Sequence, residues 1–468
     1  MRSRAYHDFI AAKGVDVGSH GFEPPELPAV LKQHQRAAVE FAIAKGRAAL
    51  FLDTGLGKTL CELAFAQAVV ERTSCPVLIL APLAVGTQFV SEGGRFGLPC
   101  KQVRSGDEVV GAAIYVTNYE RLGGFDTSVF AGVVLDESSI LKSFTGKTKQ
   151  VLITAFRDTP YRLAATATPA PNDFTELGSH AEFLGVLGQM EMLCRWFRND
   201  TSEASQSWRL MRHAATEFWD WVAGWSRCAT LPSDLGGCDD GYILPDVERV
   251  VHTVERDITQ DPGEGMLFAI PELSATSFHR EKRITLDARC ELAARLASTG
   301  EPVTVWCETN DESARLASLI DGAVELKGSD SADTKEGKLI GFARGDFPVI
   351  VTKAKIAGFG VNWQHCAHAV FASISFSYEQ HYQAVRRSHR FGQTRRVRND
   401  IVISDTEASV WNAVNRKSAD HDRMKVEMAR AMRSAQTVTL RRAYDTPPAF
   451  AFPPFLKSST GGAHGAAT

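Results

Sequence analysis

The chain has 468 residues, 44% of them hydrophobic, and carries 52 Lys and Arg side chains against 55 Asp and Glu. At about 100–200 residues per domain, this length predicts two or three domains and excludes a single one. Because the charges nearly balance, whole-molecule charge gives no support for a nucleic-acid partner, and any basic surface must be local.

The nine cysteines are scattered, include no C-x-x-C pair and are odd in number. That pattern is typical of reduced thiols in a cytoplasm and does not predict a disulfide framework. Cys228 and Cys238 flank one loop, but two cysteines without a nearby histidine make a poor zinc site. The N-terminus lacks the apolar region of a signal peptide, and no apolar run approaches the roughly 18–20 residues of a membrane span. We therefore expect a cytoplasmic protein with no membrane partner.

The first elements in chain order predict an α/β domain over residues 31–180. Residues 1–30 mix Gly, Pro and charged residues and are expected to be an irregular lead-in. Short apolar runs that are typical of buried strands then alternate with helical patterns. These runs lie at residues 48–52, 77–81, 113–116 and 133–135. Alternating strands and helices predict a parallel sheet with right-handed crossovers.

The next segment, residues 181–280, has helical periodicity and is expected to form a helical insertion or linker. It carries five of the eight tryptophans: Trp196, Trp208, Trp219, Trp221 and Trp225. Interleaved arginines lie at Arg195, Arg198, Arg209, Arg212 and Arg227. Aromatic rings beside arginines can stack nucleic-acid bases and bind phosphates. Large aromatics at helical spacing more often fill a core, which is the interpretation we favour.

A second series of strand-like runs predicts another α/β domain over residues 281–405. The runs lie at residues 303–306, 349–351 and 369–371. The predicted fold class is therefore α/β, with two tandem doubly wound domains that contain parallel sheets and are joined by the helical Trp-rich segment. A basic helical extension is expected at 406–435. The tail at 436–468 is rich in Pro, Gly, Ala and Ser and is predicted to be disordered.

A glycine-rich turn lies between the strand-like run 48–52 and a helical pattern at 60–70. Its sequence is Asp53-Thr54-Gly55-Leu56-Gly57-Lys58-Thr59. Backbone N–H groups of such a turn close on phosphates, the lysine reaches the β and γ oxygens, and the threonine hydroxyl binds Mg²⁺. Leu52 stands where the general pattern has its first glycine. We predict an ATP cradle formed by Thr54, Gly55, Leu56, Gly57, Lys58 and Thr59.

Adjacent carboxylates follow the strand-like run 133–135, at Asp136 and Glu137. An aspartate at the end of a strand can hold the Mg²⁺ that bridges the phosphates, and a neighbouring glutamate can deprotonate the attacking water. An Asp-Glu pair alone is usually a solvated turn. Downstream of the glycine-rich turn, the pair predicts a catalytic role for Asp136 and Glu137, with Asp136 and Thr59 as the magnesium ligands.

Over residues 31–405 the chain resembles superfamily-two helicases, and among them the Swi/Snf-type DNA translocases, which are built from two RecA-like domains. The motif around Gln35 is similar to the family's adenine-reading element. Residues 78–83, 116–120 and 166–169 resemble, in turn, two nucleic-acid motifs and the motif that couples ATP state to the grip on DNA. The resemblance is closest to compact helicase-like proteins encoded by bacteriophages and prophages.

In the second domain, residues 358–362 match the motif that faces both the ATP cleft and the strand, and imply that Gly360 binds nucleotide. The family pattern Q-A-x-x-R-x-x-R-x-G-Q falls on residues 383–393. Its members imply catalytic roles for Gln383, Arg387 and Arg390. Arginines supplied from a second domain can neutralise charge on the transferred phosphoryl group. Arg386 departs from the family, whose members often carry an acidic residue there.

The resemblance also implies a set of nucleic-acid contacts: Pro82, Thr117, Asn118, Thr166, Thr168 and Asn362. It implies an ATP-dependent DNA helicase or translocase that hydrolyses ATP to ADP and phosphate, with ATP and Mg²⁺ as cofactors. The expected partner is double-stranded DNA, and replication or recombination proteins of a phage or its host are candidate further partners in a bacterial or phage-infected cell. An RNA-directed helicase and a nucleic-acid-binding scaffold with little turnover remain alternatives, because a motor of this kind reads mainly the phosphate backbone.

Overall fold

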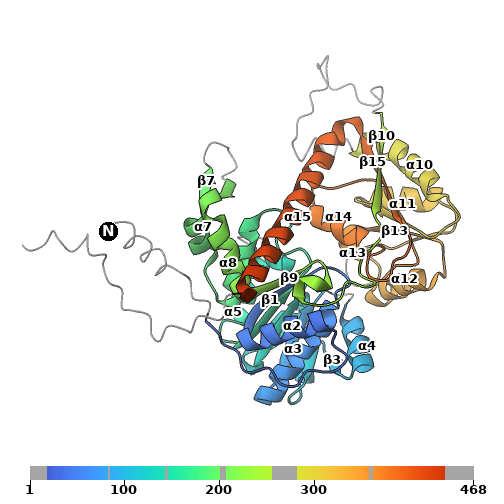
Figure 1. Cartoon of the computed structure of the whole chain (residues 1–468). Coiled ribbons are helices and arrows are strands. Elements are labelled where there is room, and N and C mark those ends of the chain that lie inside the picture. The colour runs from blue at the N-terminus through green and yellow to red at the C-terminus, as the bar shows by residue number, and fades with distance from the viewer. Residues whose placement is uncertain are drawn as a thin grey trace, which may run out of the picture.

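The computed structural model describes residues 18–82, 85–142, 146–200, 207–255, 282–357 and 362–437. Two α/β domains lie side by side, with the last helix, α15, extending from the second domain onto the first (Figure 1). None of the helices within the described ranges has both the length and the apolar character needed to cross a bilayer.

The first domain is built on a parallel sheet of seven strands among the described residues, in the order β3-β4-β2-β5-β6-β1-β9. The strands are β1 (Arg47–Leu52), β2 (Val77–Ala81), β3 (Cys100–Gln102), β4 (Ile114–Asn118), β5 (Gly132–Asp136), β6 (Tyr161–Ala165) and β9 (Ser226–Ala229). The helices are α2 (Gln33–Lys45), α3 (Lys58–Thr73), α4 (Gly86–Phe96), α5 (Lys147–Ala155), α6 (Leu177–Leu184), α7 (Gln189–Trp196) and α8 (Ala215–Trp225). An antiparallel hairpin joins β7 (Phe197–Asp200) to β8 (Ser207–Leu210).

Alternate residues along each central strand pack on opposite faces of this sheet, as the two-residue period of a strand requires. In β1, Leu50 and Leu52 contribute to the core under α2, α3 and α4. Ala49 and Phe51 contribute to the core on the other face, with the buried tryptophans of α7 and α8. Since both faces are covered, the central strands β1, β2 and β5 consist mainly of apolar residues.

The second domain has a parallel sheet of six strands in the described residues, ordered β10-β15-β14-β11-β13-β12. Its strands are β10 (Val247–Val254), β11 (Val303–Cys307), β12 (Ala323–Glu325), β13 (Val349–Lys353), β14 (His368–Phe371) and β15 (Val397–Ser404). Its helices are α10 (Leu286–Ala297), α11 (Asn310–Leu319), α12 (Ala332–Arg344), α13 (Ala354–Ala357) and α14 (Tyr378–Val385), and α15 (Ala408–Thr437) follows. This sheet too is covered on both faces, by α12, α13 and α14 on one side and by α10 and α11 on the other.

Helix α15 packs against both domains. Near its start, Val410 packs in the second-domain core. About four to six turns further on, Met424, Met428 and Met432 are buried in the core of the first domain, beside the tryptophans of α8. The helix therefore forms a strap between the domains, which its course in Figure 1 makes visible.

The predicted fold class is confirmed, because both parallel α/β sheets are present and the predicted strands match β1, β2, β4, β5, β11, β13 and β14. The segment 181–280 differs from the expected helical linker. It supplies β9 at one edge of the first sheet and β10 at one edge of the second, where each pairs with a single neighbouring strand, β1 and β15 respectively. The preferred packing role of the tryptophans is confirmed: Trp196, Trp219, Trp221 and Trp225 are at most 6% exposed in the first-domain core. The predicted domain boundaries remain predictions, and the predicted disordered tail lies, beyond residue 437, outside the described residues.

Candidate functional site

The glycine-rich turn connects the end of β1 directly to the first residue of α3, Lys58. Gly55 and Gly57 have φ angles of 96° and 80°, which side chains rarely tolerate. A Cβ atom on Gly57 would lie 2.1 Å from the Gln35 Nε2 atom, and one on Gly55 would lie 2.8 Å from Phe391 Cβ. Conformation and space therefore both require glycine, and the turn presents the N-terminus of α3, where anions are stabilised.

Gln35 supports this turn from α2. Its Oε1 accepts the Lys32 N–H at 2.9 Å, and its Nε2 donates to the Leu56 carbonyl at 3.0 Å. The side chain is only 6% exposed. The nitrogen end of the amide thus holds the phosphate turn, while its oxygen end fixes the side chain at the start of α2. The expected role of Gln35 in reading adenine stays a prediction.

The two predicted carboxylates lie opposite the turn. Asp136 ends β5, and Glu137 follows with a φ of 53°, a left-handed conformation that is uncommon for a residue with a side chain. The Lys58 ammonium lies 3.0 Å from Glu137 Oε1 and 3.8 Å from Asp136 Oδ1. The sequence prediction that Lys58, Asp136 and Glu137 share one site therefore agrees with the geometry.

Burial and charge set the ionisation of this group. Burial raises the pKa of Asp136 to about 6, although Lys58 opposes the shift. Burial would lower the pKa of Lys58, but Glu137 and Asp136 outweigh it and raise that pKa above its ordinary value. The ammonium therefore stays charged and is held by two carboxylates.

Two side chains next to Asp136 were not predicted. Glu62, one turn after Lys58 on α3, is fully buried, and burial together with Asp136 raises its pKa well above the ordinary value. The Tyr119 hydroxyl donates to the Asp136 carbonyl at 2.7 Å. The spacing of four residues between Lys58 and Glu62, which places both on one helix face, was the available signal for Glu62.

Two threonines connect Glu137 to the loop after β6. The Thr166 hydroxyl donates to Glu137 Oε2 at 3.1 Å, and the Thr168 N–H donates to Thr166 Oγ1 at 3.1 Å. Both side chains are fully buried. Thr166, expected at the nucleic acid, thus contacts the candidate catalytic base instead.

The opposite wall of the site comes from the second domain. Gln383, Arg387 and Arg390 line a cleft of about 240 Å³ together with the glycine-rich turn and with Asp136 and Glu137. Burial and the neighbouring Arg390 lower the pKa of Arg387 to about 9, although Glu137 and Asp136 oppose that shift. Burial also lowers the pKa of Arg390. Among the predicted members of this site, Gly360 lies outside the described residues.

A nucleotide phosphate chain and Mg²⁺ fit this donor set. Lys58, Arg387 and Arg390 supply cationic donors for phosphate oxygens around one small cleft. Thr59 and Asp136 supply the hard oxygen ligands that Mg²⁺ prefers, and within the described residues no group of three or more His, Cys, Asp or Glu side chains is arranged to hold a metal. Mg²⁺ is usually bound by one or two carboxylates together with substrate phosphates and water, which matches this arrangement.

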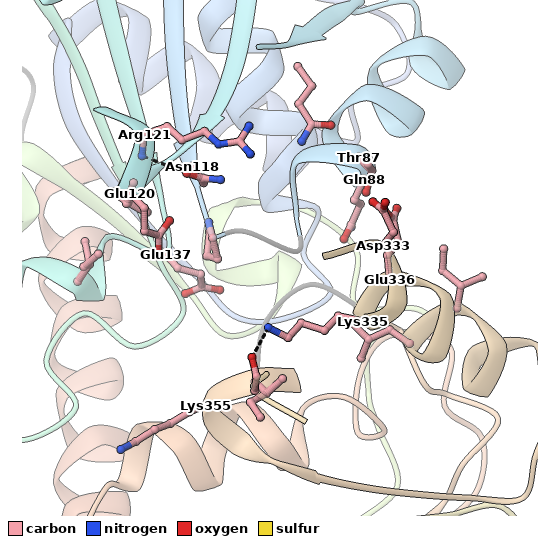
Figure 2. A pocket seen from close by; sticks show the side chains of 18 of the residues that line it. Thr87, Gln88, Asn118, Glu120, Arg121, Glu137, Asp333, Lys335, Glu336 and Lys355 are labelled. Carbon is pink, nitrogen blue, oxygen red and sulfur yellow. Dashed lines mark hydrogen bonds between the residues drawn. The ribbon is translucent and has the colours of Figure 1, made fainter. Parts of the chain in front are cut away.

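A larger cleft of about 1390 Å³ opens next to the first one, between the two domains. Figure 2 shows side chains of the first domain, among them Asn118 and Arg121, facing Lys335 and Lys355 of the second. Its lining mixes bases with acids: Arg104, Arg121, Lys142, Lys335 and Lys355 against Glu92, Glu108, Glu120, Glu137, Asp333, Glu336 and Glu379. Gln88, Glu92, Glu137 and Asn362 line both clefts, so the two share a wall.

The predicted nucleic-acid residues divide between this cleft and the interior. Pro82, Asn118 and Asn362 line the larger cleft. Thr117, Thr166 and Thr168 are at most 3% exposed. In this conformation, the hydroxyl groups of the second set are not placed to touch a ligand in that cleft.

Comparison with known proteins supports the helicase interpretation for part of the chain. Residues 285–392 match the family model of the helicase conserved C-terminal domain. The chain is also similar to the SWI2/SNF2 ATPase core of Sulfolobus solfataricus, solved in complex with dsDNA, with 18% identity over 87% of this chain and 96% of that one and a TM-score of 0.41. A search of functionally curated proteins gives no significant match. The family match lies within the second α/β domain, which supplies Arg387 and Arg390 to the smaller cleft.

Proposed function

We propose that this protein is an ATP-dependent DNA translocase or helicase of the Swi/Snf type, which hydrolyses ATP to ADP and phosphate in the 240 Å³ cleft. The observation that carries the proposal is that Lys58, Asp136 and Glu137 of one domain and Arg387 and Arg390 of the other line a single cleft. A metabolic P-loop kinase would leave the second α/β domain and its two arginines unexplained.

The first domain holds and activates the reactants. Lys58 and the N–H groups of the turn bind the phosphates. Thr59 and Asp136 would hold Mg²⁺, which would supply positive charge next to the phosphate oxygens. Glu137 accepts the proton of the attacking water. Lys58 and Glu137 are paired at 3.0 Å, so binding of phosphate to Lys58 separates the pair and frees Glu137 for water.

The second domain completes the site on closure. Arg387 and Arg390 supply planar donors to the phosphoryl group in the transition state, a contribution that amounts to roughly 10³–10⁵ in rate in comparable enzymes. Gln383, which is buried in the same wall, positions the attacking water or the phosphate. Turnover then depends on the relative position of the domains, which is how ATP hydrolysis produces movement along a strand.

Nucleic acid is assigned to the larger cleft, where Arg121, Lys335 and Lys355 lie among polar groups from both domains. Double-stranded DNA is the proposed substrate, in line with the complex solved for the similar Sulfolobus core. Replication or recombination proteins of a phage or its host are the proposed further partners, which follow from the resemblance to phage and prophage helicases. RNA remains the second candidate, since a phosphate-binding cleft accepts either backbone.

The ATPase rate of the purified protein, measured alone and with duplex DNA, single-stranded DNA or RNA, tests the proposal. We expect the strongest stimulation with duplex DNA. Preferential stimulation by RNA would support the RNA-directed alternative. Nucleic-acid binding without turnover would identify a scaffold and contradict the proposed motor.

A further inference from the structure

Asp53, the first residue of the glycine-rich turn, is the centre of a buried cluster that joins three parts of the fold. Its carboxylate accepts from Lys425 Nζ at 2.9 Å and from Arg386 Nη2 at 3.0 Å, and it also accepts a hydrogen bond from the Tyr382 hydroxyl. Asp53 is 4% exposed and Lys425 is 8% exposed. We call Asp53, Tyr382, Arg386 and Lys425 the Asp53 cluster.

The donors of the Asp53 cluster come from two anchored elements. Tyr382 lies in α14, and Arg386 follows the end of that helix in the second domain. Lys425 lies on the part of α15 that is buried in the first-domain core through Met424 and Met428. The attachment of α15 is reinforced at Met432, whose sulfur accepts the Cys228 N–H at 3.1 Å. One carboxylate thus receives a cation from the second domain and another from the strap.

The same carboxylate sets the first turn of the phosphate loop. Its Oδ1 accepts the Thr54 N–H at 2.7 Å. The Asp53 backbone is held on both sides, by its N–H to the Ala229 carbonyl at 2.9 Å and by its carbonyl, which accepts the Leu56 N–H at 3.2 Å. A rotation of the Asp53 side chain therefore breaks the hydrogen bond that fixes the Thr54 N–H at the start of the phosphate loop.

The cluster is strongly ionic. Burial alone would raise the pKa of Asp53, yet Arg386 and Lys425 hold that pKa well below its usual range. Buried charged hydrogen bonds of this kind resist rearrangement, since loss of one partner leaves an uncompensated charge. The carboxylate is therefore fixed only while the second domain and α15 are both in place.

We propose that Arg386 and Lys425 are positioning residues, which act through Asp53 to hold the phosphate loop in its binding conformation and so make ATP affinity depend on the second domain and on α15. This inference rests on the proposed ATPase function. It gives Arg386, which departs from the helicase pattern, a role toward the loop and away from the phosphoryl group. Arg386 and Arg387, adjacent in sequence, then serve ground-state binding and the transition state respectively.

The test measures KM and kcat for ATP, with saturating duplex DNA, for wild-type protein and for Lys425→Met and Arg386→Gln. Each change removes one charged hydrogen bond from the carboxylate, so we expect KM to rise by roughly tenfold with kcat nearly unchanged. Lys425→Arg, which restores a cation, should recover most of the affinity. Arg423→Met is the matched control, because Arg423 lies on the same helix and is exposed, paired only with Asp420 among the described residues.

A double-mutant cycle with Asp53→Asn separates positioning from a purely structural contribution. If the cation acts through the carboxylate, Lys425→Met should raise KM far less in the Asp53→Asn background than in the wild type. A lowered melting temperature with unchanged KM, or additive effects on KM, would overturn the proposal. Failure of the underlying function would look different, because the wild-type protein itself would then neither bind nor hydrolyse ATP in a titration with a fluorescent ATP analogue.

Discussion

The two α/β domains contribute charged groups to the same cleft in opposite electrostatic states. In the first domain, Lys58 is balanced by Glu137 and Asp136, which raise its pKa. In the second, burial and Arg390 lower the pKa of Arg387 to about 9. When the fold destabilises the charged form of a side chain, that charged form is stabilised most by binding an anion. We therefore expect the first-domain side of the cleft to hold its own charges at rest, and the second-domain side to be completed by a bound phosphate.

The largest effect on ATP hydrolysis is expected from the first-domain residues of the cleft, where Lys58 is paired with carboxylates. Lys58→Ala should abolish ATP hydrolysis, because phosphate loses its main cationic contact in the first domain. Glu137→Gln should retain ATP binding and stop turnover, since an amide of the same size cannot accept the proton of water. Steady-state turnover and nucleotide titrations on both variants measure these effects. Normal turnover in either variant would remove the pair from the active site.

On the opposite wall, Arg387→Ala or Arg390→Ala should lower DNA-stimulated turnover by roughly 10³–10⁵ while ATP affinity changes little. The nucleotide ground state is held by the first domain, so these arginines contribute mainly to the transition state. Arg→Lys should not restore the rate, because an ammonium lacks the planar fork. Arg396→Ala, at an exposed position shortly downstream, is the control. Wild-type rates in the Arg387 and Arg390 variants would contradict the two-wall site.

The features that sequence predicts well are those fixed by local pattern. The glycine-rich turn and Asp136-Glu137 follow apolar strands, so parallel-sheet geometry brings them to one edge of the sheet. Arg387 and Arg390 were identified from the resemblance of residues 383–393 to one family motif. By contrast, Asp53 and Lys425 are 372 positions apart, and no local pattern connects them. The place of β9 at the sheet edge was missed for the same reason, since four residues carry little strand signal and the neighbouring β1 supplies the pairing.

The hydrophobic core of the first domain contains more tryptophan than the core of the second domain. Trp225→Ala should lower the free energy of unfolding by roughly 3–5 kcal/mol, because the fully buried ring packs against Phe51 and Trp221. Trp208→Ala, at a half-buried hairpin position, should cost much less. Denaturant unfolding measures both. Normal stability of the Trp225 variant with loss of DNA affinity would favour base stacking over packing.

The smallest expected effect is on the free energy of unfolding at acidic pH, to which His381 of the second domain contributes. This half-buried ring contacts Phe371 and Trp411, and both of its nitrogens are buried without a hydrogen-bond partner within the described part of the chain. Burial, with a smaller contribution from Arg249, lowers its pKa from 6.5 to about 3. Between these two values the unfolded chain binds a proton that the folded chain does not, so stability is fully present above pH 6.5 and falls as the pH drops.

At pH 5 the loss attributable to His381 is at most about 2 kcal/mol relative to pH 7. His381→Phe keeps a ring in the apolar site and removes the titrating nitrogens, so the variant should lose less stability than the wild type between these two pH values. Urea unfolding of both proteins at pH 7 and pH 5 gives the comparison, in which carboxyl groups that titrate in both proteins cancel. In the first domain His180, whose pKa burial lowers to about 4, makes the same kind of contribution and is unaffected by the substitution. An equal loss of stability in the two proteins would mean that His381 is not the buried neutral group that the second-domain core requires.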